Sequence, residues 1–521
     1  MSDGKPNTIA RDTRTVASVT LLSRLFGLAR DLVTVRLFGD SLVGSAFAAA
    51  FAIPNLFRRL LGEGALSAAF IPQYTRLAEE DDDNAQRYAT LIVIALTIVT
   101  TLLLIAGEAI ILGIYYSTDD SARRFSFGLI ALLLPFMPMV CTTAIMGGML
   151  QVRGRFLPLA ASPILLSVCI IGAALAAMSL DASPERGAIW IGIATLLAGV
   201  LQILWVLAEL RVRTRWRLNT APIRREAMLT LKRFVPVLIG MGTLQLNTLM
   251  DTVIAMWPTW IGPTMLGRTV PMDEASNAIV GYTQRLYQFP LGVFGIAVAT
   301  AAFPALARTA KDRIRFTETV AHGMRLSLFI GLPATVGLFV VRRDLVEVMF
   351  SGGGGFSAEG LDRSAAVLAG YSLGVFAYSL NHMLSRSFYA QGDTLTPMRV
   401  GIVMVLVNLA SNLTLIWSLK EAGLAWSTAL TALLQTLALA LILRKRLEPN
   451  ISILPGAVRI GIVSAVMGAL VWLTLALLPS ADTWSTSALR LGAAVVVGVG
   501  SYIALALVLK MPELRWLARG A

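Results

Sequence analysis

Charged residues are scarce in this chain of 521 residues. Aspartate, glutamate, lysine and arginine make up 14% of it, whereas hydrophobic residues make up 56%. A soluble globular domain carries about 25% charged residues, so the composition excludes an ordinary soluble fold. The apolar residues run in long stretches between short polar loops. This pattern predicts an all-α polytopic membrane protein rather than a β-barrel, whose strands are short and alternate in polarity.

Residues that usually build reactive centres are also few. Cys141 and Cys169 lie in apolar stretches, and His322 and His382 are isolated. The sequence has no HExxH zinc motif, no Walker A loop, no Asp-rich metal motif and no recognisable Ser-His-Asp arrangement. We therefore expect no disulfide, no metal, no cofactor and no enzymatic reaction.

The net charge of +13 would suggest nucleic-acid binding in a soluble chain. In a membrane protein the same excess is expected from the lysines and arginines of cytoplasmic loops. We therefore expect no nucleic-acid partner.

Fourteen stretches are long and apolar enough to cross a bilayer, which takes about 20 residues of helix. They lie at 15–39, 43–72, 86–116, 124–151, 156–179, 186–209, 228–257, 275–306, 316–341, 363–390, 395–417, 421–444, 457–479 and 488–510. The first carries arginines in its middle, which a cleavable signal peptide does not, so we expect it to be a retained helix.

The loops between these spans alternate in charge. Lysine and arginine gather after the even-numbered spans, for example at 211–217, 308–315 and 444–446. Loops after odd-numbered spans are acidic or poor in cations, as at 119–120 and 273–274. By the positive-inside rule, this alternation predicts that both termini are cytoplasmic.

A weak internal repeat divides the chain. Residues 68–82 at the end of the second span resemble 300–312 at the end of the eighth, and 151–158 resemble 390–397. Two parallel six-helix halves, a transporter architecture, explain this, although apolar helices also resemble one another by composition. We predict an N-terminal lobe at 1–217 (spans 1–6), a C-terminal lobe at 218–446 (spans 7–12) and two appended helices at 447–521 (spans 13–14).

Ionisable residues interrupt the first two spans. Arg24 and Arg30 lie in the first span, and Arg58 and Glu63 in the second. A cation at mid-bilayer depth costs about 2.5–3.5 kcal/mol, so we expect a water-filled cavity that receives a negatively charged ligand. The alternatives are a local charge balance around Asp31 and anchoring at the cytoplasmic end. One acid cannot balance both arginines of the first span, however.

Two further positions bear on this cavity. Arg59 and Glu63 are four residues apart and are expected to pair along the helix. Arg285 in the eighth span is the counterpart of the second-span arginines and again lies near a proline, Pro290. Asp251 in the seventh span either counters a cavity arginine or faces outward.

Arg24, Arg30, Arg58 and Arg285 together would form a positive pocket. The planar guanidinium group binds phosphate and pyrophosphate through two hydrogen bonds, whereas an exporter of cationic drugs would need acids there.

Four segments carry a resemblance to a known family. They are SRLFGLARD (23–31), AFAIPNLFRRLLGEGALSAAFIP (50–72), QRLYQFPLGVFGIAVATAAFP (284–304) and FYAQGDTLTP (388–397). They resemble the signature segments of the MurJ (MviN) family over essentially the whole chain. This family belongs to the multidrug/oligosaccharidyl-lipid/polysaccharide exporter superfamily.

The resemblance implies a flippase of lipid II, the undecaprenyl-pyrophosphate-linked disaccharide-pentapeptide, in the bacterial inner membrane. It implies that Arg24, Arg30, Arg58 and Arg285 bind the substrate. The supporting or gating positions are Ser23, Gly27, Asp31, Asn55, Arg59 and Glu63. Membrane lipids and cell-wall synthesis proteins are the other expected partners.

The chain departs from the family pattern at two positions. Ser45 and Gln284 stand where members often carry an aspartate, so both changes are expected to make the cavity more positive. We expect alternating access between the lobes, with the lipid tail along the appended helices. Three alternatives remain: export of another polyprenyl-linked glycan, a non-transporting scaffold that binds lipid-linked precursors, and a cation antiporter, which the sign of the cavity disfavours.

Overall fold

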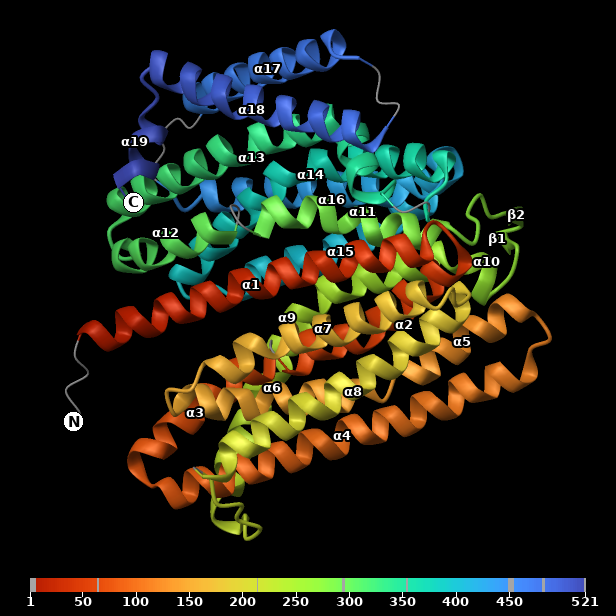
Figure 1. Cartoon of the computed structure of the whole chain (residues 1–521). Coiled ribbons are helices and arrows are strands. Elements are labelled where there is room, and N and C mark those ends of the chain that lie inside the picture. The colour runs from red at the N-terminus through yellow and green to blue at the C-terminus, as the bar shows by residue number, and fades with distance from the viewer. Residues whose placement is uncertain are drawn as a thin grey trace. The chain divides into compact units, whose positions relative to one another are not determined.

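Helices make up nearly all of the secondary structure in the computed structural model, which describes residues 6–62, 65–212, 214–292, 296–352, 355–447, 454–479 and 483–519 (Figure 1). Within these ranges the only sheet is a two-stranded hairpin, β1 (Thr264–Met265) and β2 (Arg268–Thr269). The predicted all-α membrane fold is confirmed.

The chain forms two compact units, Met1–Gly262 and Pro263–Ala521. The helices of the first are α1 (Pro6–Phe38), α2 (Leu42–Phe57), η1 (Arg58–Gly62), α3 (Ala65–Glu80), α4 (Asp82–Ser117), α5 (Ser121–Leu133), α6 (Phe136–Val152), α7 (Leu157–Ser179), α8 (Pro184–Arg211), η2 (Ala221–Ile223), α9 (Arg224–Ala255) and α10 (Trp257–Trp260). Those of the second are α11 (Ser276–Pro290), α12 (Ile296–Thr309), α13 (Arg313–Phe350), α14 (Ala358–Ala390), α15 (Leu395–Leu419), α16 (Ala422–Arg444), α17 (Leu454–Leu477), α18 (Trp484–Val508) and α19 (Pro512–Arg519).

Each of the fourteen predicted spans coincides with a helix or with an interrupted series of helices. The second span contains α2, η1 and α3, the fourth contains α5 and α6, and the eighth contains α11 and α12. Among the described residues, nine helical segments are long and apolar enough to cross a membrane. The chain is therefore a multi-pass membrane protein. Helices α1, α2 and α11 fall outside this group because they are charged or short.

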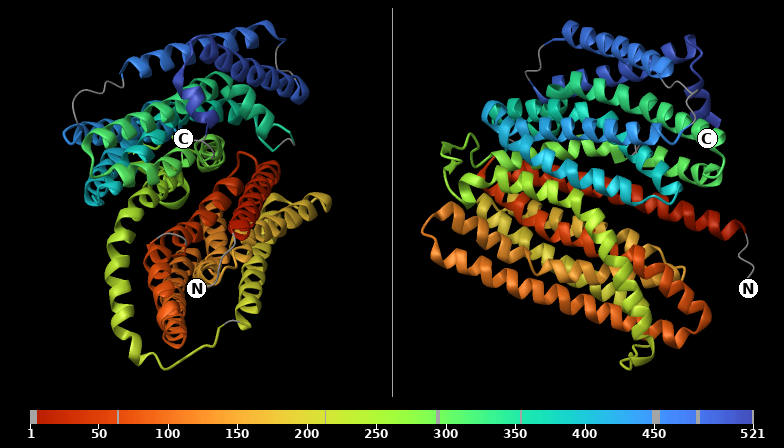
Figure 2. Two further views of the ribbon diagram at one scale, coloured as in Figure 1. Left: turned by 90° about the vertical axis from the view of Figure 1, so that its left-hand side faces the viewer. Right: turned by 180° about the vertical axis from the view of Figure 1, so that it is seen from behind.

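The seventh span, α9, packs with the first unit, although the predicted boundary after residue 217 puts it in the C-terminal lobe. Helix α9 packs against α3 and belongs to the first unit. The predicted lobes are defined by the internal repeat and not by packing, so the boundary after residue 217 stays a prediction. In the second unit, α17 and α18 pack on each other and on α13 (Figure 2).

Apolar side chains divide between an interior and a lipid-facing surface. In the first unit, Phe70 stacks on Tyr74 and on Tyr88, with ring centroids 5.2 and 5.5 Å apart. The Tyr88 hydroxyl shares a hydrogen bond of 2.6 Å with Thr230, which ties α4 to α9. Ile98 and Leu102 on α4 are instead exposed. A membrane-spanning helix presents such residues to lipid.

The repeated loops end their helices in the same way. Gly154 and Gly392 both have positive φ, +75° and +79°. The next amide closes the turn in each case, from Arg155 to the Leu150 carbonyl (2.8 Å) and from Asp393 to the Phe388 carbonyl (3.0 Å). This is the Schellman arrangement, in which glycine adopts the left-handed conformation at little cost. The common geometry supports the internal repeat.

Asp393 ties the loop between α14 and α15 to the end of α16. Its carboxylate accepts hydrogen bonds from the Thr396 amide (2.9 Å), the Thr396 hydroxyl (2.7 Å) and Arg446 (2.6 Å). Burial raises the pKa of Asp393, but these bonds and the Arg446 charge outweigh it and lower the pKa to about 2.

This pKa predicts a defined acid dependence of stability. Because the folded value lies below the ordinary 3.8, the stabilisation is fully present above about pH 4 and is lost as the pH falls toward 2. We expect Asp393→Asn to lower the free energy of unfolding at pH 7 by about 1–2 kcal/mol and to flatten its acid dependence. Thermal unfolding of the purified protein between pH 7 and 3 measures both effects. Glu274→Gln, at an exposed acid of the same unit, is the control; equal acid sensitivity of Asp393→Asn and wild type would contradict the prediction.

Candidate functional site

Helix α1 carries the first group of predicted site residues. It packs chiefly against α7. Arg24 is exposed and forms no hydrogen bond or ion pair with any residue that the structure describes, while Ser23 beside it is half-buried. A Cβ atom added at Gly27 would meet nothing within 4 Å. The surface of α1 around Arg24 and Gly27 is thus open.

Arg30 and Asp31 form a fixed pair one turn beyond Gly27. Nε and Nη2 of Arg30 both donate to Asp31 Oδ1, at 2.9 and 2.8 Å. The guanidinium also lies 5.5 Å from the ring centroid of Phe51 on α2, a cation–π distance. Both charged side chains are 18% exposed, so this is a partly desolvated pair. Asp31 therefore pairs with Arg30, the nearer of the two arginines.

The second group lies where α2 gives way to a π-helical turn, η1. Pro54 inside α2 has no N–H to donate, and the amide of Arg58 bonds to the carbonyls of Pro54 and Asn55 at the junction. Such turns are rare and concentrate at functional sites. The Arg58 side chain donates from Nε to Asn55 Oδ1 at 3.1 Å. The amide of Asn55 thus helps to orient this guanidinium group.

The remaining second-span positions are described only in part. Arg59 is exposed and takes part in an interaction. Glu63 lies outside the described residues, and so does the predicted Arg59–Glu63 pair. Ser45, one of the departures from the family pattern, is fully buried within the first unit.

Arg285 lies in α11, in the second unit, and is half-buried, as is Gln284 beside it. Its helix packs on α14, where the Tyr287 ring stacks on Tyr371 with centroids 4.6 Å apart. Helix α11 ends at Pro290 and α12 begins at Ile296. The predicted convergence of Arg285 with the three arginines of the first unit stays a prediction.

The charge balance of the first two helices favours an anion. Across the first two predicted spans, residues 15–72, the chain has five arginines, two aspartates and one glutamate, and Asp31 is held by Arg30. Asp251 on α9 is 5% exposed, which contradicts the alternative that it faces outward. Cationic groups in a poorly hydrated setting attract phosphate strongly through charge-assisted hydrogen bonds.

Sequence reasoning missed the charged pairs that join distant segments of the second unit. Arg363 on α14 donates to Glu421 at 2.6 Å and to both oxygens of Asp273, at 2.7 and 2.9 Å. Burial raises the pKa of Asp273, but the hydrogen bond and charge of Arg363 outweigh it, so the pKa is lowered. Arg490 on α18 likewise bonds to Asp344 on α13, at 2.6 Å. The partners lie 58 to 146 residues apart, and no local pattern predicts such pairs.

Comparisons with known proteins agree with this architecture. The family model described as "Lipid II flippase MurJ" matches residues 34–494, which include Arg58 and Arg285; Arg24 and Arg30 precede this range. A probable lipid II flippase MurJ of Vibrio cholerae is 30% identical, with 95% of each chain covered. A lipid II flippase MurJ of Burkholderia cenocepacia is 29% identical over 83% of each chain.

Solved structures share the fold. A lipid II flippase MurJ in an inward closed conformation superposes with a TM-score of 0.78 at 20% identity, covering 96% of this chain and 99% of that one. An inward-facing MATE-family transporter gives a TM-score of 0.67 at 14% identity, over 83% of this chain and 97% of that one. From the match over 34–494 and these relatives, the chain belongs to the lipid II flippase MurJ family.

Proposed function

We propose that this protein moves lipid II from the cytoplasmic to the periplasmic leaflet of the bacterial inner membrane. The observation that carries the proposal is the set of arginines on α1 and at the α2–η1 junction, in a membrane protein of the lipid II flippase family. A pyrophosphate linked to a sugar is an anionic, hydrogen-bonding headgroup. It is the kind of ligand that compensates guanidinium groups placed within membrane spans.

Each arginine has its own role in this proposal. Arg24, exposed beside the open surface at Gly27, makes the first contact with the pyrophosphate. Arg58, oriented by Asn55, supplies a second cation. Arg30 is held by Asp31 when the site is empty and exchanges this carboxylate for phosphate when the substrate enters. Arg285 contributes the corresponding contact from the C-terminal lobe.

The proposed movement is alternating access between the lobes at 1–217 and 218–446. Both the second and the eighth spans are interrupted a few residues after a proline, Pro54 or Pro290, and these interruptions are where we place the bending. The lipid tail stays in the bilayer along the appended helices of 447–521. Proteins that make and use the lipid-linked precursor are the proposed partners on the two sides of the membrane.

The arginine site predicts the effect of single substitutions. A hydrogen bond to a charged group contributes about 1.5–3 kcal/mol, so Arg24→Ala, Arg58→Ala and Arg285→Ala should each weaken headgroup binding roughly tenfold to a hundredfold. Lysine variants should keep part of the activity because they retain the charge without the planar fork. Rescue of cells depleted of their own flippase, read as lipid II accessible from the periplasm, measures the effect.

Arg36→Ala, at an exposed arginine near the end of α1, is the matched control and should rescue fully. Full rescue by all three site variants would contradict the cationic site. Purified protein in vesicles with labelled lipid II separates the alternatives. A scaffold would bind lipid II without moving it, and an exporter of another glycan would move that lipid in preference.

The proposed orientation predicts which loops can be labelled from outside the cell. Arg155 follows the predicted fourth span and Glu185 precedes the sixth, and both are exposed. With the native cysteines replaced, Glu185→Cys should react with a membrane-impermeant maleimide in intact spheroplasts, whereas Arg155→Cys should react only after lysis. The reverse pattern would contradict cytoplasmic termini.

A further inference from the structure

The connection that follows α8 exposes apolar and basic side chains together. The connection is defined here as Arg211, Val212 and Thr214–Asn219. Val212, Trp216 and Leu218 are 84%, 41% and 81% exposed, and Arg211 and Arg215 are exposed as well. An exposed run of this composition in a membrane protein indicates a surface that meets a partner rather than water alone.

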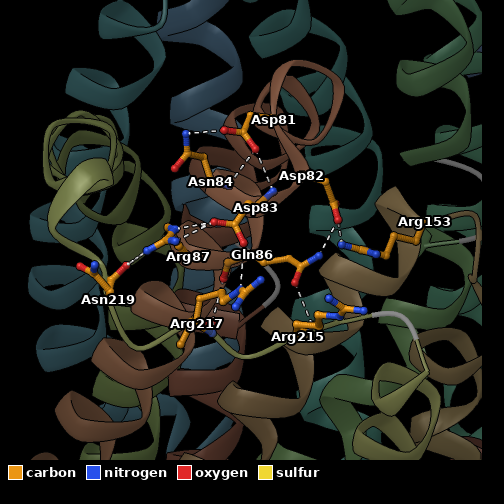
Figure 3. Close-up of polar contacts among 11 residues, drawn as sticks. Asp81, Asp82, Asp83, Asn84, Gln86, Arg87, Arg153, Arg215, Arg217 and Asn219 are labelled. Atoms are coloured by element: carbon orange, nitrogen blue, oxygen red, sulfur yellow. Dashed lines mark hydrogen bonds and ion pairs between the residues drawn. The ribbon is translucent and has the colours of Figure 1, made fainter.

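Hydrogen bonds hold this connection on the first turns of α4 (Figure 3). The amide of Arg215 donates to Gln86 Oε1 at 2.9 Å, and the amide of Arg217 donates to Thr90 Oγ1 at 3.1 Å. Gln86 and Thr90 are themselves buried. The backbone is thus fixed before any partner binds, which reduces the entropy cost of binding.

Ion pairs divide the arginines of the connection into two kinds. Asp83 receives Arg87 at 2.7 Å and Arg217 at 2.8 Å, and Arg87 also donates to the Asn219 carbonyl at 2.7 Å (Figure 3). Arg211 and Arg215 form no ion pair with any residue in the described part of the chain. Arg217 therefore stabilises the connection, while the other two charges remain available.

The acids at the start of α4 form no ion pair with Arg211 or Arg215. Asp81 caps α4 by accepting a hydrogen bond from the Asp83 amide at 2.9 Å, and Asp82 accepts one from the Arg153 side chain at 3.0 Å. With Asp83 shared by two arginines, the acids on the first turn of α4 are all engaged. The exposed face of the connection therefore carries the positive charges of Arg211 and Arg215.

The depth of the connection follows from the helices that flank it. On α4 the first exposed large apolar residue is Ile94, four residues after Thr90, to which the connection is bonded. On α8 the last is Leu207, four residues before Arg211. Four helical residues span about 6 Å, so both attachments lie about one turn outside the apolar bands. This is the level of lipid headgroups.

We propose that the connection is a lipid-binding surface, in which Val212, Trp216 and Leu218 enter the membrane interface and Arg211 and Arg215 bind the phosphates of anionic lipids. Tryptophan favours this interface because its ring is apolar and its N–H is polar. Arginines close to an anionic leaflet are attracted to it. The depth and the charge select lipid over a protein partner. The surface is independent of the substrate that the protein transports.

The test uses brominated lipids, which quench the fluorescence of a nearby tryptophan. The full-length protein is placed in phosphatidylcholine vesicles that contain either brominated phosphatidylglycerol or brominated phosphatidylcholine. Because the chain has ten tryptophans, the fluorescence of Trp216 is obtained as the difference in emission between the wild type and Trp216→Phe. We expect the Trp216 fluorescence to be quenched by both brominated lipids and more strongly by phosphatidylglycerol. The preference for phosphatidylglycerol should fall as salt is added.

Charge removal tests the headgroup contacts. In Arg211→Gln and in Arg215→Gln the preference for phosphatidylglycerol should fall about fivefold each, while quenching by phosphatidylcholine stays unchanged because the connection remains in place. Arg186→Gln is the control, since this exposed arginine lies at the other end of α8, and it should behave as wild type. A Trp216 component that brominated lipid does not quench, or equal quenching by both lipids, would overturn the proposal.

Discussion

Lipid cannot hydrogen-bond to a protein backbone, and this constraint governs the whole structure. Every amide and carbonyl at bilayer depth must find a partner within the protein, so each span is a helix. Hydroxyl side chains follow the same rule. Thr100 on α4 and Ser464 on α17 each donate to the carbonyl four residues earlier, at 2.8 Å. The second and eighth spans each depart from a continuous α-helix within a few residues after a proline, Pro54 or Pro290.

The arginines within the spans have two kinds of surroundings. Arg490 is neutralised by Asp344 and Arg363 by Glu421, across helices that these pairs join. Buried pairs of this kind are strongly destabilised when one partner is removed, which gives them a structural role. Arg24 is exposed and Arg58 is oriented by a neutral amide. Arg24 has no acidic partner among the described residues, and in this it differs from the arginines that join helices.

Much of the fold was predictable because its signals are local. A run of 20 apolar residues requires a helix wherever it occurs, and glycines such as Gly154 and Gly392 favour a helix end because they adopt the left-handed conformation easily. Candidate arginines stand out for the same reason, since each is a cation in an apolar run. Pairing is different. Asp31 could have joined Arg24 or Arg30 by spacing alone, and the structure selects Arg30.

The sequence by itself determined the helical membrane fold, the positions of its spans and the excess of cations in the first two. These follow from the cost of placing polar groups in lipid, which acts on each segment separately. Only the tertiary structure decided which charges are neutralised, that α9 packs with the first unit, and that the connection after α8 is held on α4 with its apolar side chains exposed. Those contacts join residues up to 188 positions apart, as in the pair of Arg325 and Glu513. They form because side chains meet only after the helices have packed.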